Sequence, residues 1–488
     1  MALLLLIILI VSEIGFIVFE LMKKPVKSEF AKMRLFANIS QLLIFFLMLL
    51  LPGIDLSFRF KGLLFILIVR FFVSAAIFLI QGKNEKAESD KAKSEKAEGE
   101  NAESVKAEGE RVKNKKTKKK VMIVLSGVLS VLLISTNMIP AFVFADYKGR
   151  AVTGEYTVGQ KKAIFIDPSR TETFENDNSC REVPVYFYYP EELTENEKGK
   201  NSLPLVIFSH GAFGYYQSNS STYMELASHG YIVVSLDHPY HSFFTKDSSG
   251  KTITVNPEFI QTALVIGGDT DSGLSAEETW IVTSEWIKLR MDDMNFVLDT
   301  LKEGADGKFT DAWFFPEDSE DDIAKIVSCI DTKRIGLIGH SLGGATAVSV
   351  GRRDDVKAVV DLDGTMLGEE TGVENGVVII NEDAYTTPLL CIDNEEHYMD
   401  REKAENGGYN YANNVILNNA TDGYVTYFKG AEHMNYTDLP LFSPFLAGML
   451  GTGDVDAAEC IDRMNAIVLN FFDCYLKDAG TFEVSESY

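Results

Sequence analysis

The chain has 488 residues, of which 46% are hydrophobic and 24% are charged, with 71 Asp and Glu against 46 Lys and Arg. This composition excludes a fibrous repeat and a wholly disordered chain, and the net charge of −25 argues against nucleic acid as the main partner, because binding phosphates needs a surplus of Lys and Arg. The charge is unevenly divided. Residues 1–145 carry 21 basic and 13 acidic residues, whereas residues 146–488 carry 25 and 58. The sequence therefore joins an apolar, basic first third to an acidic, water-soluble remainder.

Four apolar runs dominate the first third, and each has about the 20 residues that cross a ~30 Å hydrocarbon layer. They lie at 2–21, 35–51, 63–80 and 121–145. The first run lacks the basic start and small-residue cleavage pattern of a signal peptide, so we expect it to be retained. The predicted organisation is three transmembrane helices in 1–82, a charged low-complexity cytoplasmic linker at 83–120, a fourth transmembrane helix at 121–145, and a catalytic domain at 146–488.

The Lys and Arg residues of the short loops predict the orientation in the membrane. The first loop carries five basic residues between positions 23 and 34, and the loop at 83–120 carries 13. We therefore expect both loops in the cytoplasm, and the N-terminus and residues 146–488 outside. The second of these loops, in which KAEGE occurs twice, is predicted to be a flexible or transiently helical tether. Arg70, inside the third run, is expected to pair with Glu13 or Glu20.

The acidic remainder alternates short β-branched strands with helical patterns, which predicts a largely parallel sheet covered by helices on both faces. In such sheets, sites form in the loops at the carboxyl ends of strands. The predicted strands are 183–189, 203–209, 231–236, 334–339, 358–362, 389–392 and 424–428. The predicted helices include 223–228, 282–301, 317–329, 342–350 and 457–476.

A Gly-x-Ser-x-Gly motif at 339–343 lies between a predicted strand and a helix of small residues. In this setting the motif predicts that Ser341 is a nucleophile held in a strained, exposed turn. A serine needs a base to accept its proton and donors for the developing oxyanion. His433, which follows the last predicted strand, is the expected base. The backbone amides of Ala212 and Leu342 are the expected oxyanion donors.

The acid of the predicted triad is left open by the residues alone. Asp363 and Asp393 each follow a predicted strand between the serine and His433, and chain order does not separate them. His238 and His241 are interpreted as a loop packed under the site rather than a metal pair. His397 is not expected to take part, because it lies within the start of a polar helix.

No cofactor or metal is predicted, because no dinucleotide fingerprint, P-loop or zinc spacing is found. All five cysteines lie in the outer part, and Cys329 and Cys391 are expected to be core residues. Disulfides are possible there, but no pattern in the sequence requires one.

Five stretches of the sequence together resemble the platelet-activating factor acetylhydrolase family of α/β-hydrolases: 208–211, 226–238, 335–346, 361–364 and 429–435. The resemblance implies an α/β-hydrolase fold, here preceded by about four transmembrane helices. It also implies a calcium-independent serine esterase that cuts short acyl chains from phospholipids or related esters. The family takes its acid from a Leu-Asp after the strand that follows the nucleophile helix, which corresponds to Asp363, with Asp393 as the rival.

Two parts of the chain have no counterpart in the secreted members of that family, namely the membrane runs and an insert at 245–283. Phe259, Trp280 and Trp286, in and near this insert, are expected either to pack internally or to form a lid at the lipid surface. The expected partners are an ester or phospholipid substrate and the lipid bilayer. A non-catalytic, membrane-tethered sensor and an acyltransferase with the same triad are the alternative functions.

Overall fold

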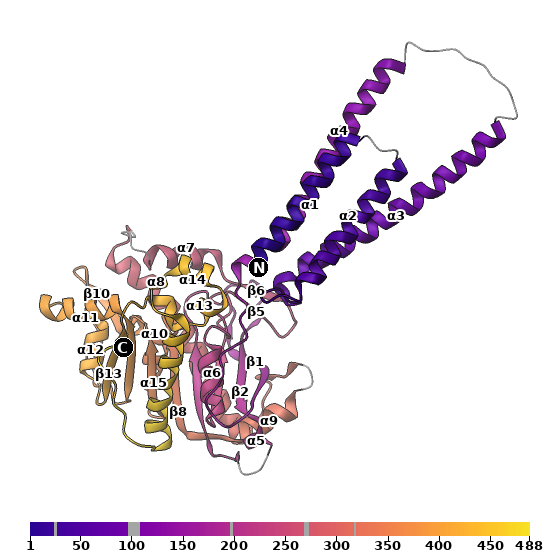
Figure 1. Ribbon diagram of the computed structural model, residues 1–488. Helices are drawn as coiled ribbons and strands as arrows, with labels where there is room; N and C mark the ends of the chain where they lie inside the picture. Colours follow the sequence, from indigo (N-terminus) through magenta and orange to yellow (C-terminus); the bar gives the residue numbers. More distant parts are fainter. Residues whose placement is uncertain (24–26, 96–107, 196–198, 268–272, 317–318) are drawn as a thin grey trace. The chain divides into compact units, whose positions relative to one another are not determined.

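The computed structural model describes residues 1–488 except 24–26, 96–107, 196–198, 268–272 and 317–318. The chain divides into two compact units, one of Met1–Tyr147 with Phe442–Phe445, and one of Lys148–Leu441 with Leu446–Tyr488. The first unit consists of long helices, whereas the second is built around a large sheet (Figure 1). The helices of the first unit are α1 Ala2–Lys23, α2 Lys27–Met48, α3 Phe58–Glu95 and α4 Glu108–Val143.

Each of these four helices contains a segment long and apolar enough to cross a membrane. The segments are Ala2–Met22, Glu29–Met48, Phe58–Asn84 and Val121–Val143. Beyond them, α3 continues to Glu95 and α4 begins at Glu108, so part of the predicted tether is helical. The first KAEGE repeat lies outside the described residues.

The helical unit buries a carboxylate and exposes apolar side chains. Glu13 on α1 is fully buried, and its two carboxylate oxygens lie 2.7 Å from Arg34 and 2.6 Å from Arg70. Gln41 adds a hydrogen bond of 3.1 Å. The predicted pairing of Arg70 is thus confirmed for Glu13. On the outside of the same helix, side chains such as Val11 are more than half exposed, which is the reverse of a water-soluble bundle.

The second unit contains a nine-stranded sheet in the order β13-β12-β9-β8-β3-β4-β2-β1-β7. Neighbouring strands from β13 to β4 are parallel, and β2, β1 and β7 are added antiparallel. Its strands are β1 Val158–Thr171, β2 Cys180–Pro190, β3 Leu203–Ser209, β4 Ile232–Leu236, β7 Trp313–Phe314, β8 Ile330–His340, β9 Val356–Leu362, β12 Leu389–Asn394 and β13 Gly423–Phe428. The expected largely parallel sheet is confirmed, and every predicted strand lies within or overlaps one of these.

Helices cover both faces of the sheet, as the alternating strand residues require. Leu205 and Ile207 of β3 belong to one core, and Val206 and Phe208 to the other. The first core is covered by α8 Ala276–Ala305, α9 Glu320–Ser328 and α10 Leu342–Val350. The second is covered by α6 Ser220–Ser228 and α15 Ala457–Lys477.

The remaining elements lie mainly in the connections. They are α5 Glu191–Thr194, β5 Phe244–Lys246, β6 Thr252–Thr254, α7 Pro257–Ile266, β10 Glu370–Glu374, β11 Val377–Ile380, α11 Glu395–Gly407, α12 Ala412–Asn418, α13 Leu439–Phe442 and α14 Pro444–Leu450, with short 3-10 turns at Leu367–Glu369 and His433–Tyr436. The predicted insert at 245–283 corresponds to β5, β6 and α7, and it ends inside α8, which is longer than its predicted 282–301.

Strand order creates a switch point between β3 and β8, which are direct neighbours. After β3 the chain turns to β4 on one side, and after β8 it turns to β9 on the other. The two connections leave in opposite directions, so a crevice opens at the carboxyl ends of these two strands. The segments that begin there are His210-Gly211-Ala212 and the turn containing Ser341.

Candidate active site

Ser341 occupies a sharp turn between β8 and α10. Its backbone has φ 56° and ψ −126°, an unfavourable conformation for a residue with a side chain. The flanking glycines allow it, because a Cβ on Gly343 would lie 1.9 Å from the Ser209 carbonyl oxygen. The Ser341 N–H donates to the Leu362 carbonyl at 2.9 Å, which ties the turn to the end of β9.

Asp363 and His433 meet beside this turn. Asp363 directly follows β9, is 1% exposed, and accepts a hydrogen bond of 2.6 Å from His433 Nδ1 on its Oδ2. His433 begins the 3-10 turn that follows β13, and its side chain is 34% exposed. Asn394 donates to Asp363 as well, through its backbone N–H at 2.6 Å and its side chain at 2.9 Å. His433 and Asn394 together thus supply three hydrogen-bond donors to this carboxylate.

A second imidazole, that of His397, binds the same carboxylate, which the sequence analysis did not anticipate. His397 Nδ1 lies 2.8 Å from Asp363 Oδ1. The residue is in the first turn of α11, whose N-cap Asn394 accepts from the His397 backbone N–H at 2.7 Å. The spacing of Asn394 and His397 could have indicated this contact. An Asn that caps a helix at the end of a strand places the residue three positions later over the end of that strand.

The hydrogen bonds that Asp363 accepts determine its protonation state. Burial by itself would raise the pKa of Asp363, but the hydrogen bonds from His397 and His433 hold it well below its usual range. Burial opposes protonation of His397, yet the hydrogen bond and charge of Asp363 raise its pKa to about 9. Asp363 is thus a carboxylate at neutral pH, and His397 is an imidazolium beside it.

Asp393, the rival acid, is engaged elsewhere. Its carboxylate forms an ion pair with the buried Arg401, and its backbone carbonyl accepts a hydrogen bond of 2.6 Å from the phenol Oη of Tyr436. In the described part of the chain, Asp393 makes no hydrogen bond to a histidine. The structure therefore brings Asp363, and not Asp393, to His433.

Ser341 is less closely joined to His433 than His433 is to Asp363. Across the described residues, no hydrogen bond joins Ser341 Oγ to His433. The segment of His433 is nevertheless held against the turn, because His340 Nε2 donates to the His433 carbonyl at 3.0 Å and the two rings are 4.6 Å apart. Burial, followed by the charge of His433, lowers the pKa of His340 to about 3, so His340 is a neutral donor here. Nucleophile–base contacts are often long without substrate.

The predicted oxyanion donors lie on the two segments that leave the switch point. A Cβ on Gly211 would fall 3.2 Å from Ser341 Cβ, so the loop containing Ala212 lies against the serine turn. Leu342 begins α10, and its N–H has no intrahelical acceptor. Among the described residues, neither the Ala212 N–H nor the Leu342 N–H donates to a backbone carbonyl. Neither of the two expected donors is thus taken up by a backbone carbonyl.

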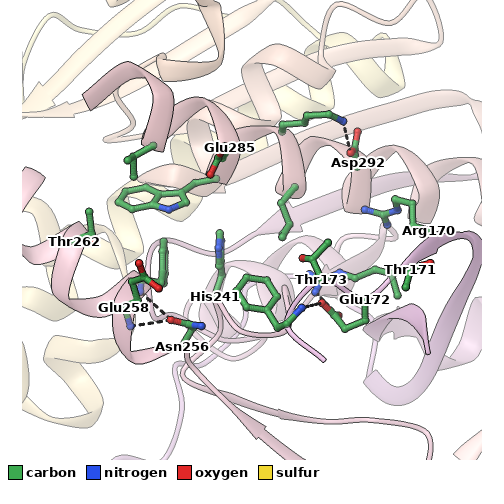
Figure 2. A pocket seen from close by; sticks show the side chains of 17 residues that line it. Arg170, Thr171, Glu172, Thr173, His241, Asn256, Glu258, Thr262, Glu285 and Asp292 are labelled. Atoms are coloured by element: carbon green, nitrogen blue, oxygen red, sulfur yellow. Dashed lines mark hydrogen bonds and ion pairs between the residues drawn. The ribbon is translucent and has the colours of Figure 1, made fainter. Parts of the chain in front are cut away.

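A cavity of about 690 Å³ is lined by His241, by residues at the end of β1 and by residues of α7 and α8. Figure 2 shows His241 between Asn256 and Glu258 on one side and Glu172 and Thr173 on the other. The cavity is also lined by aromatic side chains, Phe174, Phe259 and Trp286.

The aromatic residues of the predicted insert pack internally. The Phe259 ring stacks on His241 at 3.9 Å and meets Trp286 edge-on at 4.9 Å. Trp280 Nε1 donates to the Glu370 carbonyl at 3.0 Å. These contacts favour the packing interpretation over the lid.

The other predicted roles can also be located. His238 is fully buried and lies 2.9 Å from both Ser209 Oγ and Asp293 Oδ2, which agrees with a loop packed under the site. The described residues contain no cluster of three His, Cys, Asp or Glu side chains arranged to hold a metal ion. All five cysteines are free thiols, and Cys329 and Cys391 are buried in the core as expected.

The family model described as platelet-activating factor acetylhydrolase, isoform II, matches residues 190–483. The chain belongs to this family. The match includes the serine turn, Asp363, His433 and the oxyanion loop, and it leaves the helical unit Met1–Tyr147 outside.

Individual relatives are distant. The platelet-activating factor acetylhydrolase of Bos taurus is 25% identical over 285 residues, covering 56% of this chain and 57% of that protein. The one from Gallus gallus is 25% identical over 309 residues, covering 58% and 64%. The chain thus spans about three fifths of the length of these curated relatives. A solved structure of a ferulic acid esterase from Streptomyces cinnamoneus aligns with a TM-score of 0.47 at 20% identity, covering 68% of this chain and 93% of that one.

Proposed function

We propose that the protein is a membrane-anchored serine hydrolase of carboxylic esters, and that Ser341, His433 and Asp363 form its catalytic triad. The observation that carries the proposal is the 2.6 Å hydrogen bond from His433 to the buried Asp363, formed beside the strained turn of Ser341. A nucleophile on a strained turn, a base and a buried acid, from the ends of three strands, are the parts that acyl transfer requires.

In this mechanism Ser341 Oγ attacks the ester carbonyl carbon while His433 Nε2 accepts the hydroxyl proton. The tetrahedral intermediate collapses, the bond to the leaving alcohol breaks, and His433 gives the proton to that alcohol. Water then attacks the acyl-enzyme with His433 again as the base, and the carboxylic acid and free serine are released. Asp363 stays ionised, orients the imidazole and stabilises its charged form.

The Ala212 and Leu342 N–H groups are proposed to bind the oxyanion in both steps. Preorganised donors of this kind act mainly on the transition state, because the negative charge develops only there. One such donor is typically worth about 10²–10³ in turnover.

For the substrate, we propose a phospholipid-type ester with a short acyl chain. The support is family membership and the names of the relatives, which include a probable 1-alkyl-2-acetylglycerophosphocholine esterase of Arthroderma benhamiae, 22% identical over 177 residues. The acidic charge of residues 146–488 adds a preference for neutral or zwitterionic esters, since it repels anions at long range.

The test is hydrolysis of p-nitrophenyl acetate by the full chain in detergent micelles. Ser341→Ala is expected to lower kcat by about 10⁶-fold, because the nucleophile is lost, and to abolish labelling by a fluorophosphonate. Ser221→Ala, a buried serine of α6, is the matched control and keeps its labelling. Turnover that survives Ser341→Ala would refute the proposal.

The same assay separates the alternative functions. An unlabelled Ser341 in the wild-type protein, without turnover, would favour a non-catalytic sensor. Accumulation of a new ester when a competing alcohol is added would favour acyl transfer.

We further propose that residues 1–82 and 121–145 span the membrane four times, with the linker 83–120 in the cytoplasm and residues 146–488 outside. The four apolar helices and the charge of the loops support this. In membranes washed with alkaline carbonate, the full chain is expected to stay in the pellet. Protease added to intact cells is expected to digest residues 146–488 but not the linker. Release by carbonate would contradict the spans, and digestion of the linker would reverse the orientation.

A further inference from the structure

Arg290 on α8 is the largest of the fully buried side chains, with an exposed fraction of 0%. Among the described residues, no carboxylate forms an ion pair with it. Its donors go to neutral acceptors instead: Nη1 to the His210 carbonyl at 2.5 Å, Nη2 to the Gly211 carbonyl at 3.2 Å, and Nε to His241 Nδ1 at 3.3 Å. All three acceptors belong to the oxyanion loop or to the residue packed behind it.

Burying a guanidinium in this way is unusual, because taking a charge out of water costs several kcal/mol unless it is paired. The neighbouring Arg181 shows the ordinary solution, since it is buried between Asp293 and Glu172. Asp293 is already bonded to Arg181 and His238. Burial lowers the pKa of Arg290 to about 9, which still leaves it charged at neutral pH. Because burying the charge of Arg290 without a carboxylate partner is unfavourable, we expect this residue to do more than fill space in the core.

We propose that Arg290 is a positioning residue for the oxyanion hole, which it serves by fixing and polarising the peptide group between Gly211 and Ala212. This inference rests on the proposed function. In a trans peptide the C=O and the following N–H point in opposite directions. A guanidinium that holds the Gly211 carbonyl from behind therefore directs the Ala212 N–H to the opposite side, where the loop lies against Ser341.

Two further contacts hold the same loop. His210 Nδ1 lies 2.7 Å from the Gly211 carbonyl and is a second donor to it, because a carbonyl oxygen can only accept. Burial holds the pKa of His210 well below its usual value, so the ring is neutral and its Nε2 is left as an acceptor. The Phe213 N–H donates to the His241 carbonyl at 3.1 Å. Phe213 is in the left-handed region, with φ 48°, so the loop needs such restraints to keep its conformation.

His241 connects these restraints to Arg290. Arginine can only donate, so His241 Nδ1 must be the acceptor, which puts the proton of the neutral ring on Nε2. Burial, followed by the charge of Arg290, lowers the pKa of His241 to about 2, which agrees with a neutral ring. Arg290 thus restrains Ala212 on both sides along the chain. On the N-terminal side it binds the Gly211 carbonyl, and on the C-terminal side it binds His241, whose carbonyl accepts from the Phe213 N–H.

Removing Arg290 is expected to weaken the stabilisation of the transition state and to leave substrate binding unchanged. Without Arg290, the Ala212 N–H is a weaker and less well-aimed donor, so kcat falls while KM changes little. A thionoester is a direct probe, because its sulfur accepts hydrogen bonds poorly and gains less from the oxyanion hole than the ester oxygen does. The preference for an ester over the matching thionoester therefore measures how well the hole works.

The experiment compares kcat and KM for phenyl acetate and its thiono analogue in the full-length protein, normalised to sites titrated with a fluorophosphonate. Arg290→Met is expected to lower kcat for the ester about 10–10²-fold, with KM within about twofold, and to lower the ester-to-thionoester ratio about tenfold. Arg290→Lys, which keeps the charge and some donors, is expected to recover part of that ratio. Lys302→Met, on the same helix and paired with Asp355, is the control and keeps the wild-type ratio.

An ester-to-thionoester ratio that is unchanged in Arg290→Met, per titrated site, would overturn the proposal, as would an equal fall in Lys302→Met. If Arg290→Met yields no titratable protein, Arg290→Lys decides: a wild-type ratio refutes the role, and a reduced ratio supports it. A wild-type protein that neither hydrolyses the ester nor reacts with the probe would instead refute the proposed function itself.

Discussion

A buried carboxylate in each of the two units receives two basic side chains, and the partners differ in kind. In the helical unit, Glu13 lies between Arg34 and Arg70. In the α/β unit, Asp363 lies between His397 and His433. Guanidinium groups keep their protons at any physiological pH, whereas imidazoles can exchange theirs near neutrality. The first arrangement is suited to joining helices, and the second to moving a proton.

The surroundings of the two carboxylates differ as well. In the helical unit, the buried Glu13 is joined by an apolar core, and many further apolar side chains are exposed on the outside of the helices. Around Asp363 the apolar residues form two cores on either side of a sheet, and the polar groups gather at the strand ends. Both acids are buried, so the chemistry of the partners, and not burial, is what suits Asp363 to proton transfer.

Among changes to these two carboxylates and their partners, the largest effect on activity is expected from neutralising Asp363. Asp363→Asn is expected to lower kcat by about 10⁴-fold, because the asparagine no longer orients the imidazole in the required tautomer or stabilises its charged form. The measurement is ester hydrolysis per folded molecule. Asp393→Asn is the control, and it is expected to lower stability, since it leaves Arg401 buried without its partner, while kcat changes only a few-fold. The opposite ranking would make Asp393 the acid.

Neutralising the structural carboxylate is expected to change stability and leave the chemistry intact. Glu13→Gln leaves Arg34 and Arg70 without their counter-charge, so the helical unit is expected to lose about 3 kcal/mol in its free energy of unfolding. Unfolding in detergent micelles measures this, and kcat per titrated site is expected to stay unchanged. Glu29→Gln, an exposed site on α2, is the control. Equal stability of the two variants would show that the Glu13 cluster contributes nothing.

The smallest expected effect sharpens the role of the second imidazole. In the wild type, the charged His397 shares Asp363 with His433, the proposed base. In His397→Gln the second imidazole is absent while Asp363 and His433 are kept, so kcat/KM is expected to change by less than about tenfold, far less than in Asp363→Asn. A loss as large as that of Asp363→Asn would make His397 the imidazole on which activity depends.

The pH dependence of stability tests the charge of His397 independently. His397 has a pKa raised to about 9 in the folded state from 6.5, so its contribution to stability is complete below about pH 6.5 and is lost as the pH rises through 9. The difference in Tm between the wild type and His397→Gln is therefore expected to shrink across that window. A constant difference would assign the effect to packing.

Local sequence patterns predicted much of the site. The serine turn depends on a strand, two glycines and a helix start that are adjacent in the chain, so residues 334–350 alone indicated it. The same holds for the strand-following positions of Ala212, Asp363 and His433. What these patterns could not predict was pairing across the sheet. Asp363 and Asp393 both follow strands, and only the neighbouring positions of β9, β12 and β13 and the ion pair to Arg401 distinguish them.

The division into an apolar helical part and an acidic α/β part could be predicted from the order of residues, as could the local conformation of Ser341. Both follow from short-range periodicity and from which residues tolerate a given backbone conformation. The folded chain was needed to find that His397 shares Asp363, that Arg70 pairs with Glu13, and that Arg290 binds the loop at 210–212. These contacts join residues that are distant in the chain, and the packing of whole elements selects them.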